Sequence, residues 1–257
     1  MFARLKVVAR EILKRLNLLG PYHKVKGRIQ SHFPEPAPSF YTLSPDLLVA
    51  IHSCLRRGET LGILNNSDYL EFGIYRGFAF WYSQATTRDM NIPDMRFFGF
   101  DSFTGLPEMA GRDKHGDFRK GQFRAAQKLV ENNLNTFGVD WNRTFLIPGF
   151  FSDSLNEETK RKNNLHKCSL CVIDCDLYES ARYALNFVSP LLHEKAFIIF
   201  DDWNCYNADP DKGERKAFSE FLSENPGMKA TPYKQFGTNC QVFFIEKKEN
   251  GVTLISD

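Results

Sequence analysis

Two similar stretches decide the fold: Cys171-Val-Ile-Asp-Cys-Asp-Leu-Tyr-Glu-Ser180 and, further along, Phe197-Ile-Ile-Phe-Asp-Asp-Trp203. Each is a short apolar run that ends abruptly in acidic residues, a pattern typical of a buried parallel strand. Open α/β sheets bind their ligands at the carboxyl ends of such strands. We therefore expect the acidic residues of both stretches to converge in one crevice: Asp174, Asp176, Asp201 and Asp202.

These four acidic residues predict a cation site. Carboxylates in one crevice repel one another unless protons or a cation neutralise them, and hard oxygen ligands at this density suit Mg²⁺ or a similar divalent cation. One residue separates Asp174 from Asp176, so both side chains can reach the crevice. An Asp after a strand can instead cap the following helix. That alternative explains any one of the four, but two paired clusters on neighbouring strands favour the cation.

Strands and helices alternate along most of the chain. The expected strands span residues 69–74, 96–100, 144–147, 170–174, 196–200, 229–236 and 240–246. The expected helices span 77–89, 122–137, a segment from 154, 179–192 and 214–222. Such alternation predicts an α/β fold with a doubly wound, seven-stranded, mostly parallel sheet. A Gly-Thr-Asn turn joins the last two strands and is too short for a parallel crossover, so this pair must be antiparallel.

The composition is that of an ordinary soluble globular protein. Of the 257 residues, 42% are hydrophobic and 25% are charged, which allows a sizeable core. A net charge of only +2 argues against a nucleic-acid partner. No run reaches the roughly 18 apolar residues of a membrane span, and charges interrupt the N-terminus too often for a signal peptide. Six cysteines, including Cys168 and Cys171 in a C-x-x-C, form no disulfide framework and predict buried thiols in the cytoplasm.

Residues 1–60 are expected to form an N-terminal helical extension ahead of a catalytic domain at 61–257. Residues 2–19 predict a basic amphipathic helix. It could lie on the inner face of a membrane, or pack on the domain or on a second subunit; we favour packing and expect a homo-oligomer. Four prolines within residues 32–45 predict a linker or a lid, and Ser44-Pro45-Asp46 begins a helix.

Glycines at the first strand-to-helix junction, Glu71-Phe-Gly73-Ile-Tyr-Arg-Gly77, predict a cofactor loop. Their spacing differs from the G-x-G-x-x-G of dinucleotide-binding sheets. Glu71 would repel a phosphate but suits a cationic amino group. Asp101 ends the next strand, where it can accept hydrogen bonds from a ribose diol. A ligand with a nucleoside at one end and a cation at the other is S-adenosylmethionine.

Six stretches cover roughly residues 68–220 in one order: Glu71-Phe-Gly-Ile-Tyr-Arg-Gly77, Phe100-Asp-Ser-Phe-Thr-Gly-Leu-Pro107, Gly121-Gln-Phe123, Gly149-Phe-Phe-Ser-Asp-Ser154, Asp174-Cys-Asp-Leu-Tyr-Glu-Ser180 and Asp201-Asp-Trp203. In these stretches the chain resembles the macrocin O-methyltransferase family, the cation-dependent sugar O-methyltransferases of antibiotic pathways. The second and fifth stretches are long enough to be specific.

The resemblance implies a Rossmann-like class I methyltransferase fold with an antiparallel last strand. It implies that S-adenosylmethionine is bound by Glu71, Gly73, Gly77, Asp101, Ser102, Phe151 and Ser152, the last two near the adenine. It implies Mg²⁺ held by Asp174, Asp201 and Asp202. Asp176 is the implied general base, with Asp174 as the other candidate. The methyl acceptor is then a hydroxyl of a saccharide or glycoconjugate.

Other functions remain to be weighed against this one. A catechol-type O-methyltransferase would use the same metal with a flat aromatic diol. An NAD or nucleotide-sugar enzyme is disfavoured by the glycine spacing, and a non-catalytic binding module is disfavoured because none of the acidic residues is missing. The first 67 residues and the segment after Asp202 depart from the family, and both would border the acceptor. If residues 2–19 bind the inner membrane, the acceptor would be a bacterial surface glycan.

Overall fold

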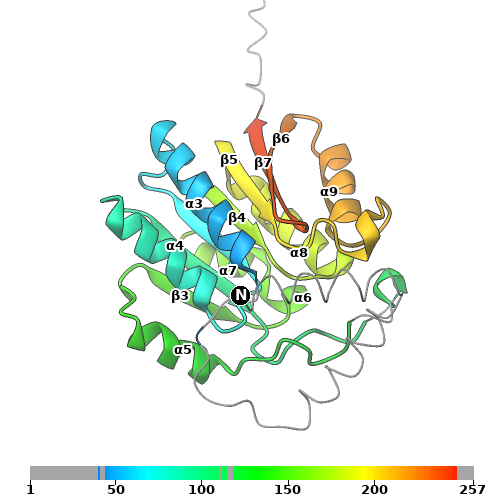
Figure 1. The fold of residues 1–257 in the computed structure, drawn as a ribbon, viewed down its shortest axis with the longest axis horizontal. Coiled ribbons are helices and arrows are strands. Elements are labelled where there is room, and N and C mark those ends of the chain that lie inside the picture. Colours follow the sequence, from blue (N-terminus) through cyan, green and yellow to red (C-terminus); the bar gives the residue numbers. More distant parts are fainter. Residues whose placement is uncertain (1–39, 41–43, 110, 115–117, 248–257) are drawn as a thin grey trace, which may run out of the picture.

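The computed structural model describes residues 40, 44–109, 111–114 and 118–247. In this part of the chain one seven-stranded sheet lies between two layers of helices (Figure 1). The helix predicted at residues 2–19 and the prolines before Ser44 lie outside the described residues. Among the helices that are described, none is both long and apolar enough to span a bilayer.

The sheet confirms the predicted strand number and directions. Its strands are β1 Asp68–Phe72, β2 Arg96–Asp101, β3 Thr144–Pro148, β4 Cys168–Ile173, β5 Leu192–Phe200, β6 Met228–Phe236 and β7 Cys240–Lys247. They are arranged in the order β3-β2-β1-β4-β5-β7-β6. The first five are parallel, and β7 runs antiparallel to both β5 and β6. The chain moves outward from β1 to β3 and then returns to β4, so the strand order reverses between β1 and β4. Ligands of open α/β sheets bind beside such a reversal.

Helices cover both faces of the sheet. The α-helices are α3 Pro45–Thr60, α4 Phe78–Asp89, α5 Gln127–Thr136, α6 Phe151–Ser154, α7 Glu157–Lys162, α8 Tyr178–Val188 and α9 Gly213–Glu224, and the short 3-10 turns are η1 Gly111–Asp113, η2 Ser189–Leu191 and η3 Tyr206–Ala208. α3, α4 and α5 pack on one face, and α8 and α9 pack on the other.

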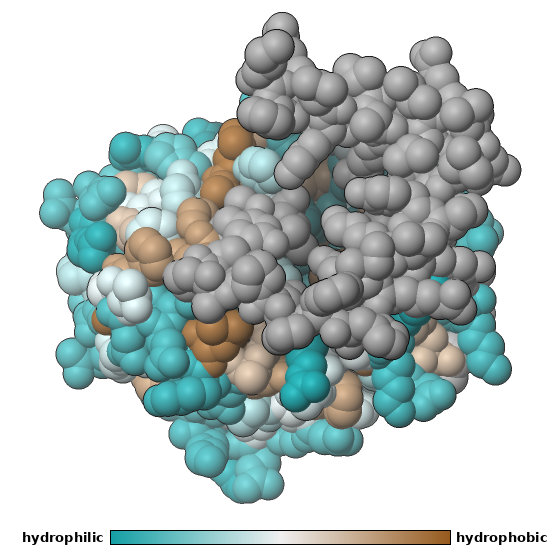
Figure 2. Space-filling view, turned by 60° about the horizontal axis from the view of Figure 1, so that its bottom comes forward, coloured by the Kyte–Doolittle hydropathy of each residue, from teal (hydrophilic) through white to brown (hydrophobic). Residues whose placement is uncertain are grey.

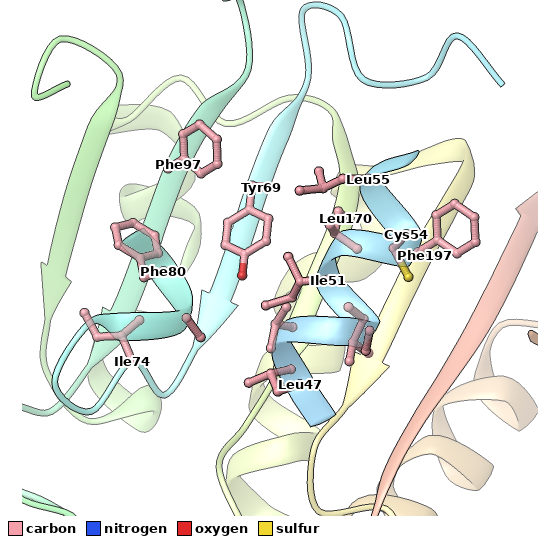
Figure 3. Close-up of a cluster of buried hydrophobic side chains, with 14 of the residues drawn as sticks. Leu47, Ile51, Cys54, Leu55, Tyr69, Ile74, Phe80, Phe97, Leu170 and Phe197 are labelled. Atoms are coloured by element: carbon pink, nitrogen blue, oxygen red, sulfur yellow. The ribbon is translucent and has the colours of Figure 1, made fainter. Parts of the chain in front are cut away.

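Strand β1 is buried over its whole length, because both of its faces are covered by helices. Alternate side chains therefore enter two different cores. Tyr69 lies between Phe80 of α4 and Ile51 of α3 (Figure 3). Leu70 points to the other face and packs in the cluster that contains Ala181 of α8. α3 thus packs on the same sheet as α4 and α8, while the predicted domain boundary after residue 60 stays a prediction.

One predicted helix begins later than expected. The helix predicted from Gln122 begins at Gln127. The intervening backbone instead pairs with an earlier turn: the Gly121 N–H donates to the Leu106 carbonyl, and the Leu106 N–H donates to the Gln122 carbonyl, both at 2.9 Å. This pairing uses backbone groups that a helix would need, so the sequence-based boundary was wrong by five residues.

The helix predicted at 179–192 also ends earlier, at Val188. Pro190 lies in the 3-10 turn that follows, and its missing N–H cannot continue the helical hydrogen bonds. Strand β5 consequently begins at Leu192 rather than at residue 196. In place of the helix predicted from residue 154 the structure has two short helices, α6 and α7, because the two residues between them are not helical.

Candidate active site

The carboxyl ends of β4 and β5 bring the predicted acidic residues together. Asp174 and Asp176 follow β4, and Asp201 and Asp202 follow β5, whose last residue is the register partner of the last residue of β4. The Asp176 N–H donates to Oδ2 of Asp202 at 3.2 Å. Asp176 and Asp201 are buried, whereas Asp174 and Asp202 are partly exposed. Figure 2 turns this edge of the molecule toward the viewer; on the coloured surface, hydrophobic residues gather near the middle and hydrophilic residues lie toward the rim.

The acidic residues raise one another's pKa. Burial raises the pKa of Asp174 well above its ordinary range, and the nearby carboxylates of Asp201 and Asp202 raise it further. Burial and the same kind of repulsion raise the pKa of Asp176. The pKa of Asp201 is raised to about 7, mainly by burial and then by Asp202. None of the ion pairs between described residues involves Asp174, Asp176 or Asp201. The cluster therefore has to hold protons or a cation at neutral pH.

The donor chemistry of this cluster fits a hard divalent cation, because its ligands are carboxylate oxygens. Two of these carboxylates accept hydrogen bonds from side chains: Oδ1 of Asp201 accepts from the Ser44 hydroxyl at 2.6 Å, and Oδ1 of Asp202 accepts from the Cys205 thiol at 3.3 Å. Within the described residues no three His, Cys, Asp or Glu side chains already form a metal-binding group. These side chains would have to turn toward a cation in order to bind it.

The backbone of Asp176 is held in an unusual conformation. Its φ is 60°, in the left-handed region that non-glycine residues rarely adopt. The Tyr206 hydroxyl donates to the Asp176 carbonyl at 3.0 Å. A Cβ at Gly213 would lie 2.7 Å from the Tyr206 ring, so the absence of a side chain at Gly213 allows the ring to pack there. The loop after β5 thereby fixes the position of the predicted general base.

A second contact orders the chain just after Asp176. The carboxylate of Asp113, in η1, accepts the Tyr178 N–H at 2.8 Å and the Glu179 N–H at 3.1 Å. It thus supplies acceptors to the first turn of α8, whose own preceding residue makes no side-chain cap. The long loop between β2 and α5 is anchored beside the acidic cluster by this contact.

The predicted cofactor loop touches the acidic cluster directly. Gly73 has a φ of 90°, and a Cβ there would lie 1.9 Å from the Asp174 carbonyl oxygen. The Asp174 N–H donates to the Phe72 carbonyl at 2.9 Å. The backbone at Gly73 approaches the backbone at Asp174 so closely that only glycine fits, whether or not a ligand also binds there. Gly77 immediately precedes α4 and has a φ of 84°, and a Cβ there would lie 3.1 Å from Val130 of α5.

Asp101 organises the cofactor loop. Its Oδ2 accepts the N–H groups of Ile74 and Tyr75 at 3.0 and 3.1 Å, and its Oδ1 accepts the Phe103 N–H at 2.7 Å. The Ser102 hydroxyl donates to the Gly105 carbonyl and closes the next turn. Each carboxylate oxygen can accept more than one hydrogen bond, so the Asp101 carboxylate can still accept a hydrogen bond from a ribose hydroxyl. Ribose binding by Asp101 and Ser102 stays a prediction.

Glu71 lies inside β1, two residues before the loop. It is 1% exposed and accepts a hydrogen bond from the Tyr69 hydroxyl. Burial raises the pKa of Glu71 to about 8, against the smaller opposing effect of the Tyr69 hydrogen bond. A neutral carboxylic acid at pH 7 is a weaker partner for a cationic amino group than the sequence suggested. Contact between Glu71 and the ligand stays a prediction.

The residues predicted near the adenine lie beside β3. Phe151 begins α6, and its ring meets Phe72 edge-on, with centroids 5.8 Å apart. Ser152 is exposed and donates to the Asp153 side chain at 3.1 Å. Phe151 therefore packs against the end of β1, and the contact of Phe151 and Ser152 with adenine stays a prediction.

Comparison with known proteins identifies the family. The sequence model of the macrocin-O-methyltransferase (TylF) family matches residues 46–226, more than half of the chain. The chain belongs to the macrocin O-methyltransferase family. The match includes each of the site residues that the sequence predicted.

Two relatives of known sequence are O-methyltransferases by name. The chain is 29% identical over 170 residues to the 8-demethyl-8-(2,3-dimethoxy-alpha-L-rhamnosyl)-tetracenomycin-C 4'-O-methyltransferase of Streptomyces olivaceus. This match covers 62% of this chain and 63% of that relative. The chain is 24% identical over 185 residues to the mycinamicin III 3''-O-methyltransferase of Micromonospora griseorubida, covering 68% of each. The matched part is thus under two thirds of the length of the first relative.

A solved structure confirms the fold. The structure of the O-methyltransferase NovP superimposes with a TM-score of 0.68 at 19% identity, covering 83% of this chain and 84% of that one. At this identity the likeness establishes the class I methyltransferase fold alone.

The sequence analysis missed four residues that lie at the candidate site of this macrocin O-methyltransferase family member. Ser44 lies 157 positions from its partner Asp201. Tyr206 and Asp113 act on the backbone around Asp176 from separate loops. Glu214 is 1% exposed and accepts the Asp202 N–H at 3.1 Å. Only Glu214 carried a signal, an acid in the first turn of a helix, and that signal is typical of ordinary helix ends.

The segment before α3 is tied to the fold at two points. The Phe40 ring stacks on Phe137 with centroids 4.1 Å apart, and it meets Phe78 of α4 at 4.9 Å. Four residues later, Ser44 bonds Asp201. Phe40 thus contacts the helices beside the cofactor loop, and Ser44 contacts the acidic cluster.

Proposed function

We propose that this chain transfers a methyl group from S-adenosylmethionine to a hydroxyl of a saccharide or glycoconjugate. The observation that carries the proposal is the contact between Gly73 and Asp174, which brings the cofactor loop against the acidic cluster. Membership of the macrocin O-methyltransferase family supports methyl transfer. The name of one relative describes methyl transfer to a rhamnosyl-bearing tetracenomycin, which supports a sugar acceptor.

The donor is proposed to bind along the ends of β1, β2 and β3. Its contacts would come from the residues predicted in the sequence: Glu71, Gly73, Gly77, Asp101, Ser102, Phe151 and Ser152. Their common position at one half of the sheet edge supports this assignment, because that edge is where doubly wound sheets bind nucleosides. The acceptor would then lie over the ends of β4 and β5.

Asp174, Asp201 and Asp202 are proposed to hold Mg²⁺ or a similar cation. Such a cation, when bound, lowers the pKa of a coordinated hydroxyl and orients it. Asp176 would take the proton of the acceptor hydroxyl as its oxygen bonds to the methyl carbon. The methyl–sulfur bond breaks in the same step, which leaves S-adenosylhomocysteine and a methyl ether. In-line attack requires the oxygen about 3 Å from the methyl carbon.

The test is a methyl-transfer assay with labelled S-adenosylmethionine. Rhamnosides and nucleoside-diphosphate rhamnose are offered as sugar acceptors, and a catechol as the aromatic one. We expect label in a sugar ether, loss of transfer in EDTA and its return with Mg²⁺. Transfer to the catechol alone would reject the sugar proposal in favour of a catechol-type enzyme. Full transfer in EDTA would reject the metal.

The proposals for residues 2–19 rest on the sequence, since these residues lie outside the described part. Packing on the domain or in a homo-oligomer is favoured; the alternative is contact of a cytoplasmic enzyme with the inner membrane, where surface-glycan precursors are made. Co-sedimentation with anionic vesicles at low salt separates them. Binding that disappears when residues 1–20 are removed would favour the membrane, and a wild type left in the supernatant would favour packing.

A further inference from the structure

Glu214 is a buried acid that the proposed mechanism does not use. It lies in the first turn of α9 and is 1% exposed. Its Oε2 accepts the Asp202 N–H at 3.1 Å. Its Oε1 is buried and has no hydrogen-bond partner among the described residues. Glutamate is almost never fully buried without a partner, because removing its charge from water costs several kcal/mol.

No described cation compensates for this burial. The neighbouring Arg215 turns away: its Nε donates to the Trp203 carbonyl at 2.9 Å, and its guanidinium lies over the Trp203 ring. Lys212 pairs with Asp209 at 3.4 Å. None of the ion pairs between described residues includes Glu214. The groups that face the carboxyl group are acidic ones, at the ends of β4 and β5.

A purely structural role explains only part of this arrangement. An acid in the first turn of a helix is favoured by the helix dipole, typically by about 0.3–1 kcal/mol. That effect operates equally at exposed positions, so it gives no reason to bury the side chain. A hydrogen bond to the Asp202 N–H could be accepted by a neutral amide just as well. A proton on the buried carboxyl group would remove its charge but leave Oε1 without a hydrogen-bond partner among the described residues, whereas a nearby cation accounts for both the burial of the acid and the unused oxygen.

We propose that Glu214 is a fourth acidic residue of the cation site, placed behind Asp202 to supply negative charge and to hold the Asp202 backbone. The inference rests on the proposed function, which places a divalent cation at Asp174, Asp201 and Asp202. It adds a residue that neither the family resemblance nor the sequence pattern assigned. Glu214 acts as a positioning residue, through Asp202, on a hard divalent cation.

The experiment measures Mn²⁺ binding to the full chain by calorimetry, without donor or acceptor. Glu214→Gln keeps an acceptor for the Asp202 N–H but loses the charge, whereas Glu214→Asp keeps the charge on a shorter side chain. We expect Glu214→Gln to weaken Mn²⁺ binding at least tenfold, about 1.4 kcal/mol, and Glu214→Asp to weaken it less. Glu220→Gln is the matched control. It removes an acid from the same helix that bonds the Tyr178 hydroxyl instead, and it should bind Mn²⁺ as the wild type does.

Melting temperatures without metal verify that each variant is folded. Glu214→Met, an apolar side chain of similar length, replaces Glu214→Gln if the amide variant fails to fold. Equal Mn²⁺ affinity of Glu214→Gln and wild type would overturn the inference, as would tighter binding by Glu214→Gln than by Glu214→Asp, which is the order of a purely hydrogen-bonding role. Asp201→Asn distinguishes a failure of this inference from a failure of the proposed function. If neither wild type nor Asp201→Asn binds Mn²⁺, the metal of the proposed function fails as well; if binding needs Asp201 but not Glu214, only this inference fails.

Discussion

The carboxyl edge of the sheet has two halves, the ends of β1, β2 and β3 and the ends of β4 and β5, and their polar groups are satisfied in different ways. At the end of β2, the Asp101 carboxylate accepts three backbone N–H groups from the loops around it. At the ends of β4 and β5, Asp176 and Asp201 are buried among other carboxylates, and Glu214 Oε1 has no described partner. Backbone N–H groups of the chain satisfy the carboxylate of the first half, whereas the second half needs protons or a cation to balance its carboxylates. Donor binding and metal binding should therefore respond differently to mutation.

The largest effect is expected at the point where the two halves touch. Gly73→Ala would place a Cβ 1.9 Å from the Asp174 carbonyl oxygen at a φ of 90°. We expect a loss of more than ~3 kcal/mol in the free energy of unfolding, together with loss of methyl transfer. Gly62→Ala is the control: its φ is 68°, but nothing lies within 4 Å of the new Cβ. It should cost only the backbone strain, about 1 kcal/mol. Equal urea midpoints for the two variants would contradict the close contact.

The acidic half should be separable from donor binding. Asp201→Asn and Asp202→Asn are expected to lower turnover at least ~100-fold, about 2.7 kcal/mol in the activation free energy. Affinity for S-adenosylmethionine should stay within about twofold of wild type, because these residues lie at the other half of the edge. Turnover is measured with saturating donor, and affinity by calorimetry. A parallel loss of both would mean that the two halves are one site.

The donor half is tested at Asp101. Asp101→Ala removes the acceptor of three backbone N–H groups and is expected to weaken S-adenosylmethionine binding about tenfold, ~1.4 kcal/mol. Mn²⁺ binding should be unchanged. Asp89→Ala, at the exposed end of α4, serves as the control. Wild-type donor affinity in folded Asp101→Ala would exclude Asp101 from the donor site.

The last prediction is a pH dependence at Glu71, whose change in stability over one pH unit is small next to the effect expected at Gly73. Burial raises its pKa from 4.5 to about 8. Between these values the folded chain holds a proton that the unfolded chain has released, so stability falls as pH rises through this window, by up to about 1.4 kcal/mol per pH unit. Glu71→Gln removes this contribution and should gain stability relative to wild type from pH 5 to pH 8. Urea unfolding measures the difference, with the exposed Glu158→Gln as control. Parallel pH curves for wild type and Glu71→Gln would contradict the shifted pKa.

The sequence predicted the fold well because its strongest signals are local. Abrupt changes from apolar to acidic residues marked the ends of β4 and β5, and the short final turn required an antiparallel pair; both were confirmed. The start of α5 was wrong because Leu106, far away in sequence, pairs with the backbone at Gly121 and Gln122. No local pattern reports such a pairing.

The candidate site was predictable in part for the same reason. Asp174 and Asp201 were visible because each ends a strand. Ser44 was not, because its role depends on a partner 157 positions away. Glu214 was visible as a residue but not as part of the site, since an acid in the first turn of a helix is common. Its burial, which only the fold reveals, distinguishes it.

The hydrogen bond from Ser44 to Asp201 has a practical consequence for anyone who shortens this protein. The family match begins at residue 46, so a fragment cut at that boundary would retain every strand and nearly all of α3. It would lose the hydroxyl that bonds Asp201 and the Phe40 ring that packs on Phe137. Such a fragment could fold and crystallise and still give a wrong affinity for the proposed cation. Boundaries drawn from homology alone would therefore discard two contacts that link the N-terminal segment to the site.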